Sequence, residues 1–388
     1  MSLDDKVTTA CHRIEEMWYE TGGKCYVSFS GGKDSTVLLA LIKLCEEVLT
    51  IPVGGIPAVF SNTGIEMGVT VDFVRWCRDS GWYSNVQIIR PEHSFDWCIK
   101  KYGKPLKSKV RSEYLHRWQT GARTENTVKS LVYGIGGSGK PAKKSRLADK
   151  DFHMLSDGFG ILASPKCCTV LKKKPFKQFE KDNGLKGTIY GLRTDEGGAR
   201  ELTIKKNYEN GGKICTFYSK GKIKKAPIVD WTDDDMKEFI TKYNVPLSDA
   251  YTKYGFNRTG CMACPYNPHV GNDLKYLYYH ETNRYKASMH WLKDVYIAQN
   301  VVLPFDEAYE REREREWRLR YEPMRQEMLR KYRPNSKLIT DYQQLSIFDE
   351  VENDKQSSDY GKAYGATGSQ KDAERKERMQ HHRCMSAE

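Results

Sequence analysis

The stretch KCYVSFSGGKDSTVLLALIKL, residues 24–44, decides the fold of this 388-residue chain. It begins with a β-rich apolar run, passes through a glycine turn and continues with apolar residues at helical spacing from Val37 to Cys45. This order predicts a strand, a loop and a helix. Because the backbone amides and the helix N-terminus point into such a turn, the loop SGGKDS at residues 30–35 is predicted to bind an anion.

The residue types of this loop suit phosphate. Gly31 and Gly32 let the main chain approach phosphate oxygens closely, and Lys33 adds a positive charge. Ser30 and Ser35 add hydroxyl donors. The order of residues matches neither G-x-x-x-x-G-K-[ST] nor G-x-G-x-x-G, so a third class of nucleotide loop is required.

Further strands and helices follow the first unit. Strands are predicted at PAVFSNTG (57–64), NVQIIRP (85–91), GTIYGL (187–192) and APIVDW (226–231). Strands that alternate with helices predict an α/β fold, in which helices cover both faces of a parallel sheet and ligands bind beyond the carboxyl ends of the strands. The tetrapeptide SNTG ends the second strand, where adenine and ribose would lie if phosphates occupied the first loop.

Eleven cysteines, in a chain that begins with acids rather than with a secretion signal, indicate a reducing compartment. We therefore expect a cytoplasmic protein, and the longest apolar stretch is too short to span a membrane. Four cysteines form two close pairs, Cys167 with Cys168 and Cys261 with Cys264. Four thiolates suit zinc or a [4Fe–4S] cluster, and adjacent ligands favour the larger cluster because neighbouring side chains diverge. The other seven cysteines stand singly, and most of them are predicted to fill the core.

The loop SGGKDS resembles the PP-loop of ATP pyrophosphatases, which transfer AMP to an acceptor and release pyrophosphate. The CC pair followed much later by CxxC resembles the cluster motif of the phosphoadenylyl-sulfate and adenylyl-sulfate reductase family. Three further segments resemble the same family, and the similarity covers roughly residues 20 to 270: GLRTDEGGARELT (191–203), PIVDWTDDDMKEFI (227–240) and VPLSDAYTKYGFNRTGC (245–261).

The resemblance implies roles for individual residues. Lys33 and Asp34 would be catalytic, with Asp34 the nearest candidate ligand for Mg²⁺, and Arg193 and Arg200 would contact nucleotide or sulfate oxygens. The cysteines at positions 167, 168, 261 and 264 would hold a [4Fe–4S] cluster. The predicted ATP-binding residues are Ser28, Ser30, Gly31, Gly32, Lys33, Asp34, Ser35, Asn62, Thr63, Gly64, Arg193 and Arg200.

Two departures from the reductase pattern favour ATP as the substrate. The chain lacks the ECGLH-like segment that carries the reductase nucleophile, and Cys384 is an isolated cysteine near the end of the sequence. The loop also keeps the full SGGKDS sequence, whereas the reductases resemble an SFG variant. This layout is similar to the sulfur-inserting ATPase of DNA phosphorothioation, in which ATP adenylates the target, AMP leaves and sulfur delivered through the cluster replaces it. The alternatives are a sulfonucleotide reductase and a non-catalytic Fe–S adaptor that binds DNA.

The sequence divides into a nucleotide domain at residues 1–300, a charged, solvent-exposed helix at 301–336 and a disordered tail at 337–388. Residues 100–150 hold fourteen Lys or Arg and three acids, which indicates a basic insertion or mobile loop. The net charge is +12, and the interspersed Tyr102, Tyr114, Trp118 and Tyr133 could stack on bases, so this segment favours contact with nucleic acid over a merely solvated loop. A cysteine desulfurase or another sulfur donor is a possible partner. Residues Gln344–Phe348 resemble the peptide that docks on bacterial sliding clamps.

Overall fold

The computed structural model describes residues 2–48, 51–196, 198–209, 211–219 and 221–340. The chain forms two compact units, Met1–Met328 and Leu329–Glu388. The first unit contains the sheet and both candidate sites. In the second, the described part holds the end of the last helix and the residues that follow it to Thr340, whose carbonyl accepts a hydrogen bond of 2.8 Å from Arg330. The disordered tail predicted from residue 337 and Cys384 lie almost entirely outside the described residues.

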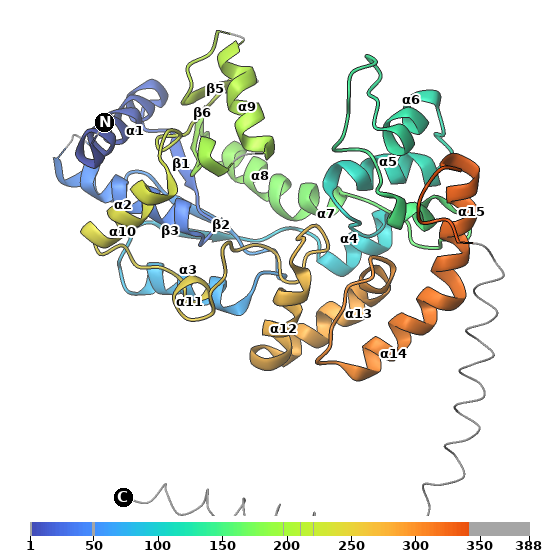
Figure 1. Ribbon diagram of the computed structural model, residues 1–388. Coiled ribbons are helices and arrows are strands. Elements are labelled where there is room, and N and C mark those ends of the chain that lie inside the picture. Colours follow the sequence, from blue (N-terminus) through green and yellow to red (C-terminus); the bar gives the residue numbers. More distant parts are fainter. Residues whose placement is uncertain (1, 49–50, 197, 210, 220, 341–388) are drawn as a thin grey trace, which may run out of the picture. The chain divides into compact units, whose positions relative to one another are not determined.

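A six-stranded sheet forms the centre of the first unit (Figure 1), with the strand order β3-β2-β1-β4-β6-β5. All neighbouring strands are parallel except β5 and β6, which pair antiparallel at one edge. The strands are β1 (Cys25–Ser28), β2 (Ala58–Ser61), β3 (Val86–Ile89), β4 (Gly187–Ile189), β5 (Thr216–Ser219) and β6 (Lys222–Lys225). The central strands β1 and β2 are apolar and almost wholly buried, as expected for parallel strands covered on both faces.

Helices cover both faces of the sheet, which confirms the predicted fold class. Helices α1 (Leu3–Thr21), α2 (Lys33–Val48) and α10 (Asp233–Lys242) pack together on one face, where their apolar residues form the main core with Val27. Successive side chains of a strand point to opposite faces. Tyr26 therefore points to the other face, where it stacks on Phe176 of helix α8 (Lys174–Asp182) at 5.9 Å between ring centroids.

The remaining helices occupy the rest of the described chain up to residue 332. They are α3 (Gly68–Asp79), α4 (Phe95–Tyr102), α5 (Lys109–Gln119), α6 (Glu125–Val128), η1 (Lys129–Tyr133), η2 (Asp149–Leu155), α7 (Lys166–Cys168), η3 (Thr169–Lys173), η4 (Thr194–Glu196), α9 (Gly198–Glu209), α11 (Asp249–Thr252), α12 (Val270–His280), α13 (Thr282–Ala298), α14 (Glu307–Glu316), η5 (Trp317–Tyr321) and α15 (Glu322–Tyr332). Across the described ranges, no helix is both long enough and apolar enough to cross a membrane.

The strand predicted at Ala226–Trp231 is wrong, because β6 ends at Lys225 and the next residues form tight turns. The amide of Val229 donates to the carbonyl of Ala226 at 3.2 Å, and Trp231 donates to Ile228 at 3.1 Å. Pro227 lacks the amide that a central strand would need, so the run cannot extend the ladder. The run looked like a strand because its apolar side chains are buried, although they are buried from a turn.

The basic segment at residues 100–150 is largely helical up to Tyr133, and residues 134–148 form turns and a loop without helix. Helices α5 and α6 and the π-turn η1 bury Leu115, Trp118 and Leu131. Trp118 is 2% exposed, and its indole nitrogen donates to the carbonyl of Leu155 at 2.9 Å. Trp118 is therefore a core residue here, and its predicted stacking on bases is wrong.

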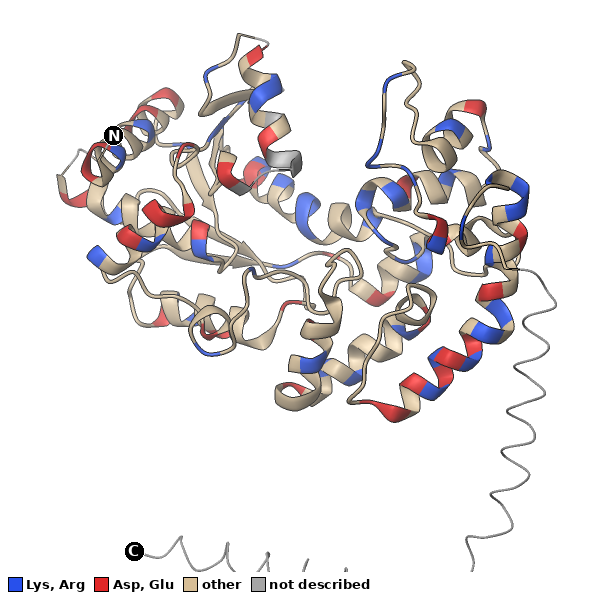
Figure 2. Ribbon diagram, in the orientation of Figure 1, with Lys and Arg blue, Asp and Glu red and all other residues tan. Residues whose placement is uncertain are grey.

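The predicted charged helix is confirmed as helical, in the three consecutive segments α14, η5 and α15. Figure 2 shows acidic and basic residues alternating along α14. The helix is not fully solvent-exposed, however, because Tyr309, Arg313 and Tyr321 are buried. The Arg313 guanidinium hydrogen-bonds the Asn300 side chain, so one face of the charged helix packs on the residues that follow α13.

Candidate nucleotide site and cysteine site

The phosphate loop joins β1 to α2, as predicted, and its two glycines are required by close neighbours. Gly31 has a φ of +69°, and a Cβ there would lie 2.9 Å from Cγ2 of Thr70 in α3. A Cβ on Gly32 would lie 2.9 Å from Oγ1 of Thr259 and 3.3 Å from Oη of Tyr251. The loop is therefore closed on one side by α3 and on the other by the segment from Tyr251 to Thr259.

Hydrogen bonds within the loop fix its shape. The hydroxyl oxygens of Ser30 and Ser35 lie 3.0 Å apart, and Ser35 Oγ donates to the carbonyl of Gly32 at 2.9 Å. Thr36 Oγ1 donates to the same carbonyl at 3.0 Å. The amide of Lys33 donates to Oη of Tyr251 at 3.1 Å. The loop is thus held in one conformation by its own hydroxyls and by a tyrosine from far along the sequence.

A cleft of about 920 Å³ opens at the carboxyl ends of β1 and β4, which is large enough for a nucleotide. Among the predicted ATP-binding residues, those that line it are Ser28, Ser30, Gly32, Lys33, Asp34, Ser35 and Arg193. The cleft is also lined by residues that had no role in the sequence prediction, among them Tyr251, Asn257, Arg258, Thr259 and Asp233. The segment 245–261 had been matched to the reductase family, but its pattern did not indicate which side chains face the phosphate loop.

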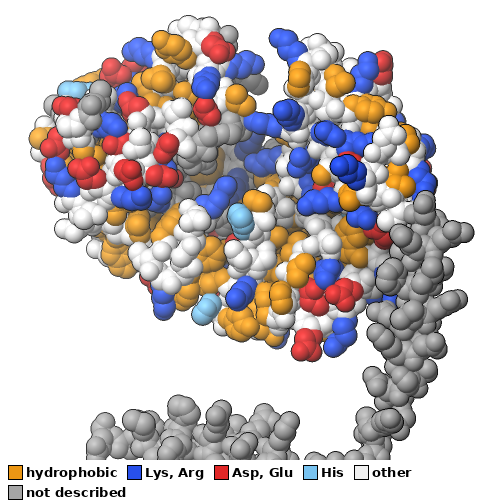
Figure 3. All heavy atoms as spheres, viewed as in Figure 1, with side chains coloured by type: hydrophobic (Ala, Val, Ile, Leu, Met, Phe, Trp, Pro, Cys, Tyr) orange, Lys and Arg blue, Asp and Glu red, His pale blue; other side chains and the backbone are white. Residues whose placement is uncertain are grey.

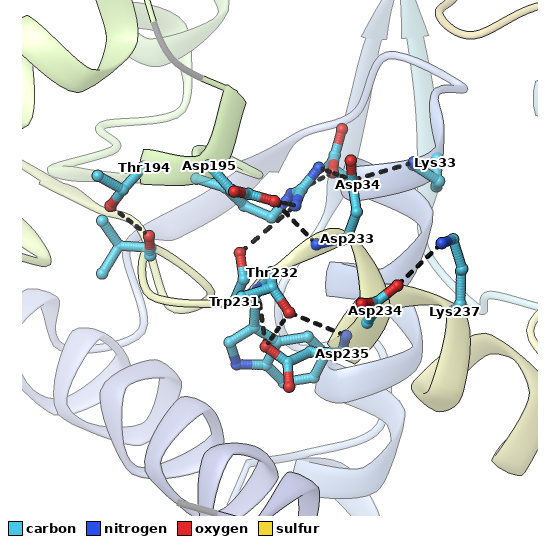
Figure 4. A network of polar contacts seen from close by, with 12 residues as sticks. Lys33, Asp34, Thr194, Asp195, Trp231, Thr232, Asp233, Asp234, Asp235 and Lys237 are labelled. Atoms are coloured by element: carbon cyan, nitrogen blue, oxygen red, sulfur yellow. Dashed lines mark hydrogen bonds and ion pairs between the residues drawn. The ribbon is translucent and has the colours of Figure 1, made fainter.

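Arg193 lies at the centre of a charged network beside the phosphate loop. Figure 4 shows Lys33, Asp34, Asp195 and Asp233 of this network. Its Nε donates to Oδ1 of Asp34 and its Nη2 donates to Oδ1 of Asp233, both at 2.8 Å. Lys33 Nζ lies 3.6 Å from the same Asp233 oxygen. Asp195 Oδ2 lies 3.6 Å from Arg193 Nη1 and accepts a hydrogen bond of 2.9 Å from the amide of Asp233. The network thereby connects the loop, the turn after β4 and the start of α10.

The charges of this network stabilise one another. Hydrogen bonding from Arg193, followed by the charges of Arg193 and Lys33, lowers the pKa of Asp233. Burial alone would lower the pKa of Arg193, but the charge of Asp34 and the hydrogen bonds that Arg193 donates to Asp34 and Asp233 outweigh it and raise that pKa. Only 4% of the Arg193 side chain is exposed. Arg193 is thus already engaged by carboxylates, and its direct contact with a nucleotide stays a prediction.

The other predicted nucleotide residues lie elsewhere. Asn62, Thr63 and Gly64 follow β2 but are not among the described residues that line the cleft. The Thr63 amide donates to Oε2 of Glu66 at 3.2 Å, and the Gly64 amide donates to Oδ1 of Asn62 at 3.1 Å. Arg200 belongs to α9, and its side chain lies outside the described part of the chain. Contacts between these four residues and ATP remain predictions.

The four paired cysteines line one cavity, as their grouping predicted. Cys167 and Cys168 form α7, and Cys261 and Cys264 flank a turn in which Ala263 has a φ of +46°. Cys261 forms an antiparallel bridge with Glu66. Most of the other lining residues are apolar, including Ile65, Leu171 and Trp291. Five of the single cysteines are buried as predicted, namely Cys25, Cys45, Cys77, Cys98 and Cys215.

The surroundings of the cysteine cavity shift the pKa values of its thiols in opposite directions. A hydrogen bond from Cys167, followed by the charges of Lys109 and Lys172, lowers the pKa of Cys168 to about 6. Burial and the charge of Cys261 raise the pKa of Cys264 to about 12. Lys172 Nζ lies 3.2 Å from Oε1 of the buried Glu66. One thiol is thus favoured as a thiolate and another as a neutral thiol.

The four thiols supply the donor type that an iron–sulfur cluster takes. Within the described ranges, however, no group of three or more His, Cys, Asp or Glu side chains is placed so that it could hold a metal ion. The four thiols share one cavity, and the cluster itself stays a prediction.

The sequence matches the family model described as phosphoadenosine phosphosulfate reductase domain over residues 24–134 and 139–267. It is similar to the adenosine 5'-phosphosulfate reductase of Streptomyces coelicolor, with 28% identity over 109 residues that cover 28% of this chain and 42% of the relative. The corresponding reductase of Rhodococcus opacus is 27% identical over 144 residues, which cover 37% of this chain and 52% of the relative. The chain thus spans about half the length of these relatives.

Two solved structures align with the chain at low similarity. The phosphoadenylyl-sulfate reductase of Candida auris, in a phosphate complex, is 16% identical with a TM-score of 0.35, and the alignment covers 61% of this chain and 81% of that one. The U34-tRNA thiolase NcsA of Methanococcus maripaludis, with its [4Fe-4S] cluster, is 14% identical with a TM-score of 0.34, covering 78% and 82%.

Proposed function

The chain belongs to the phosphoadenosine phosphosulfate reductase domain family, and from this premise we propose that it is an ATP pyrophosphatase that prepares nucleic acid for sulfur transfer. The observation that carries the proposal is the intact loop SGGKDS, whose Lys33 and Asp34 line a cleft of about 920 Å³. The loop amides and the N-terminus of α2 favour a polyphosphate at this position.

The first step is an adenylation. An acceptor oxygen attacks the α-phosphorus of ATP, the bond between the α-phosphorus and the bridging oxygen breaks, and pyrophosphate leaves with that oxygen. Lys33 and the loop amides neutralise the charge that develops on pyrophosphate. Asp34, which lines the cleft, would hold Mg²⁺, which supplies further charge neutralisation.

The second step replaces AMP by sulfur. A sulfur nucleophile at the oxidation level of sulfide displaces AMP, so no electrons are required. Cys167, Cys168, Cys261 and Cys264 would hold a [4Fe–4S] cluster, which when bound supplies a place for sulfur to be accepted and passed on. In the chain itself, Lys172 and Glu66 form an ion pair beside the cavity, and Lys172 also hydrogen-bonds Cys261.

Surface charge supports nucleic acid as the acceptor, and DNA is the proposed form. Figure 3 shows Lys and Arg side chains gathered along a hollow in one face of the first unit. Tyr133, in the basic segment, is 52% exposed and available for stacking on a base. The exposed basic residues of the segment and of the neighbouring α7, η3 and α8 include Lys109, Lys140, Lys143, Lys144, Arg146, Lys150, Lys166, Lys173, Lys174 and Lys177.

Two protein partners are part of the proposal. A cysteine desulfurase or another sulfur donor would supply the sulfur. The peptide Gln344–Phe348, which lies outside the described residues, would dock on a sliding clamp. A pull-down with purified clamp tests the second contact, which is refuted by no binding or by equal binding after Leu345→Ala and Phe348→Ala.

One experiment separates the leading function from its rivals. The anaerobically purified protein is incubated with ATP or with adenylyl sulfates, and released pyrophosphate and sulfite are measured. Pyrophosphate supports the ATP pyrophosphatase. Thiol-dependent sulfite release supports a sulfonucleotide reductase, which the similarity to adenosine 5'-phosphosulfate reductases favours as the second candidate. If Lys33→Ala leaves the biological activity intact, the chain is a non-catalytic adaptor.

A further inference from the structure

The nucleotide cleft contains carboxylates beside its cations. Lys33, Arg193, Lys224 and Arg258 line it, and so do Asp34, Asp195 and Asp233. Asp34 is the candidate Mg²⁺ ligand, and the Asp195 carboxylate accepts a hydrogen bond of 2.9 Å from the amide of Asp233. Neither role applies to the carboxylate of Asp233, whose presence beside the phosphate loop therefore needs a separate explanation.

Two of these cations, Lys33 and Arg193, lie close to the same oxygen of Asp233. Arg193 Nη2 lies 2.8 Å from Oδ1, and Lys33 Nζ lies 3.6 Å from it. An anionic oxygen shared by a lysine and an arginine is the arrangement that phosphate oxygens adopt in binding sites. We propose that Asp233 is a built-in substitute for a nucleotide phosphate: its carboxylate occupies the anion position between Lys33 and Arg193 and moves aside when phosphate binds. This inference rests on the proposed function only in the identity of the anion.

Asp233 can leave this position without damage to the fold. Its side chain is 60% exposed, so water can solvate the carboxylate once it swings out. The start of α10 does not depend on it, because Thr232 and Asp235 form the capping box: the Asp235 amide donates to Thr232 Oγ1 at 3.2 Å and the Thr232 amide donates to Asp235 Oδ2 at 2.7 Å. The carboxylate therefore competes with phosphate while contributing little to the helix.

The neighbouring residue provides a matched control. Asp234 carries the same charge in the same helical turn, but its side chain is 91% exposed and pairs with Lys237 at 2.9 Å, away from Lys33 (Figure 4). Asp233→Asn keeps the shape and the hydrogen-bond acceptor for Arg193 while it removes the charge. Asp234→Asn removes an equal charge outside the network.

The test is equilibrium binding of inorganic pyrophosphate and of ATP to the wild type and to both variants. Asp233→Asn is expected to bind pyrophosphate about three- to fivefold more tightly than the wild type, and Asp234→Asn is expected to stay within about twofold, since screened charges at surface sites have effects of this size. Asp233→Ser, which also lacks the charge, is expected to show the same gain. Added pyrophosphate should raise the unfolding temperature of both Asp233 variants more than that of the wild type.

The inference is overturned if Asp233→Asn and Asp233→Ser bind pyrophosphate no more tightly than the wild type, or if Asp234→Asn gains as much. Release of pyrophosphate from ATP is measured separately on the same proteins. Tighter binding by the Asp233 variants without any release would refute the proposed function and keep the inference. Release without tighter binding would refute the inference alone.

Discussion

Replacing Arg193 by Met should weaken both the fold and the use of Mg²⁺. The guanidinium contacts Asp34, Asp195 and Asp233 and is almost fully buried, so its removal leaves three carboxylates without their shared counter-charge. Breaking a buried ion pair costs about 3–5 kcal/mol. Because Asp195 and Asp233 are 45% and 60% exposed and can turn to water, we expect a loss of about 2 kcal/mol in the free energy of unfolding, measured by urea denaturation.

The functional effect follows from Asp34, which loses the hydrogen bond that fixes its side chain. We expect Arg193→Met to lower the apparent affinity for Mg²⁺ in pyrophosphate release by about 10- to 100-fold, the usual cost of removing a partner that orients a metal ligand. Saturating Mg²⁺ should restore much of the rate. Arg193→Lys should be intermediate, because an ammonium keeps the charge but cannot engage three carboxylates as a fork.

The control is Arg13, which forms a comparable two-pronged pair with Asp230 at 2.9 Å between α1 and the turns after β6. Arg13→Met should lower stability without changing the Mg²⁺ requirement. The reasoning is refuted if Arg193→Met raises the KM for ATP while the stability and the Mg²⁺ dependence stay at wild-type values. That result would show that Arg193 contacts the nucleotide directly.

Three further predictions concern the loop, the core and the cysteine cavity. Gly32→Ala should lower pyrophosphate release by at least about tenfold and stability by about 1–3 kcal/mol, because the new Cβ would lie 2.9 Å from Thr259 Oγ1; a fully active variant would contradict this. Burial lowers the pKa of His153 to about 3, so below pH 6.5 the unfolded state takes up a proton that the folded state does not. The free energy of unfolding should therefore fall by about 1.4 kcal/mol per pH unit between pH 6 and pH 4 relative to His153→Gln, and parallel pH profiles of the two proteins would refute it. Cys168→Ser should lower the iron and sulfide retained after anaerobic reconstitution, whereas the buried, isolated Cys98→Ser should not; equal iron in both would remove Cys168 from the site.

Local signals made part of the structure predictable. The strand, glycine loop and helix at residues 24–44 form as expected, since the apolar spacing and the glycines act within one stretch of chain. The cysteine pairs also meet in one cavity, as their spacing and the family resemblance suggested. Both features depend on residue types, the glycines of the loop and the paired cysteines, that can be recognised in the sequence without knowledge of distant contacts.

Contacts between distant residues were not predictable in this way. Nothing in the sequence around Asp233 indicates that its carboxylate faces Lys33, 200 positions earlier. The run Ala226–Trp231 shows the opposite difficulty, because burial of a turn produces the same apolar pattern as burial of a strand. Trp118 was predicted to stack on bases because its neighbours in the sequence are basic, but its own ring is buried in the core.

The two candidate sites share one chain segment, and this bears on how the two steps of the proposed reaction are linked. The Tyr251 hydroxyl accepts a hydrogen bond from the amide of Lys33. Thr259 lies so close to Gly32 that a Cβ on Gly32 would be 2.9 Å from Thr259 Oγ1. Two residues later Cys261 enters the cysteine cavity, and the amide of Met262 donates to the carbonyl of Ile65 at 2.6 Å. If a bound polyphosphate displaced Thr259, the movement would reach Cys261 through one intervening residue, Gly260. A Cβ at Gly260 would meet nothing within 4 Å. Gly260→Ala tests this link, because it stiffens the connection without a clash and should change how strongly ATP alters the visible spectrum of the reconstituted protein.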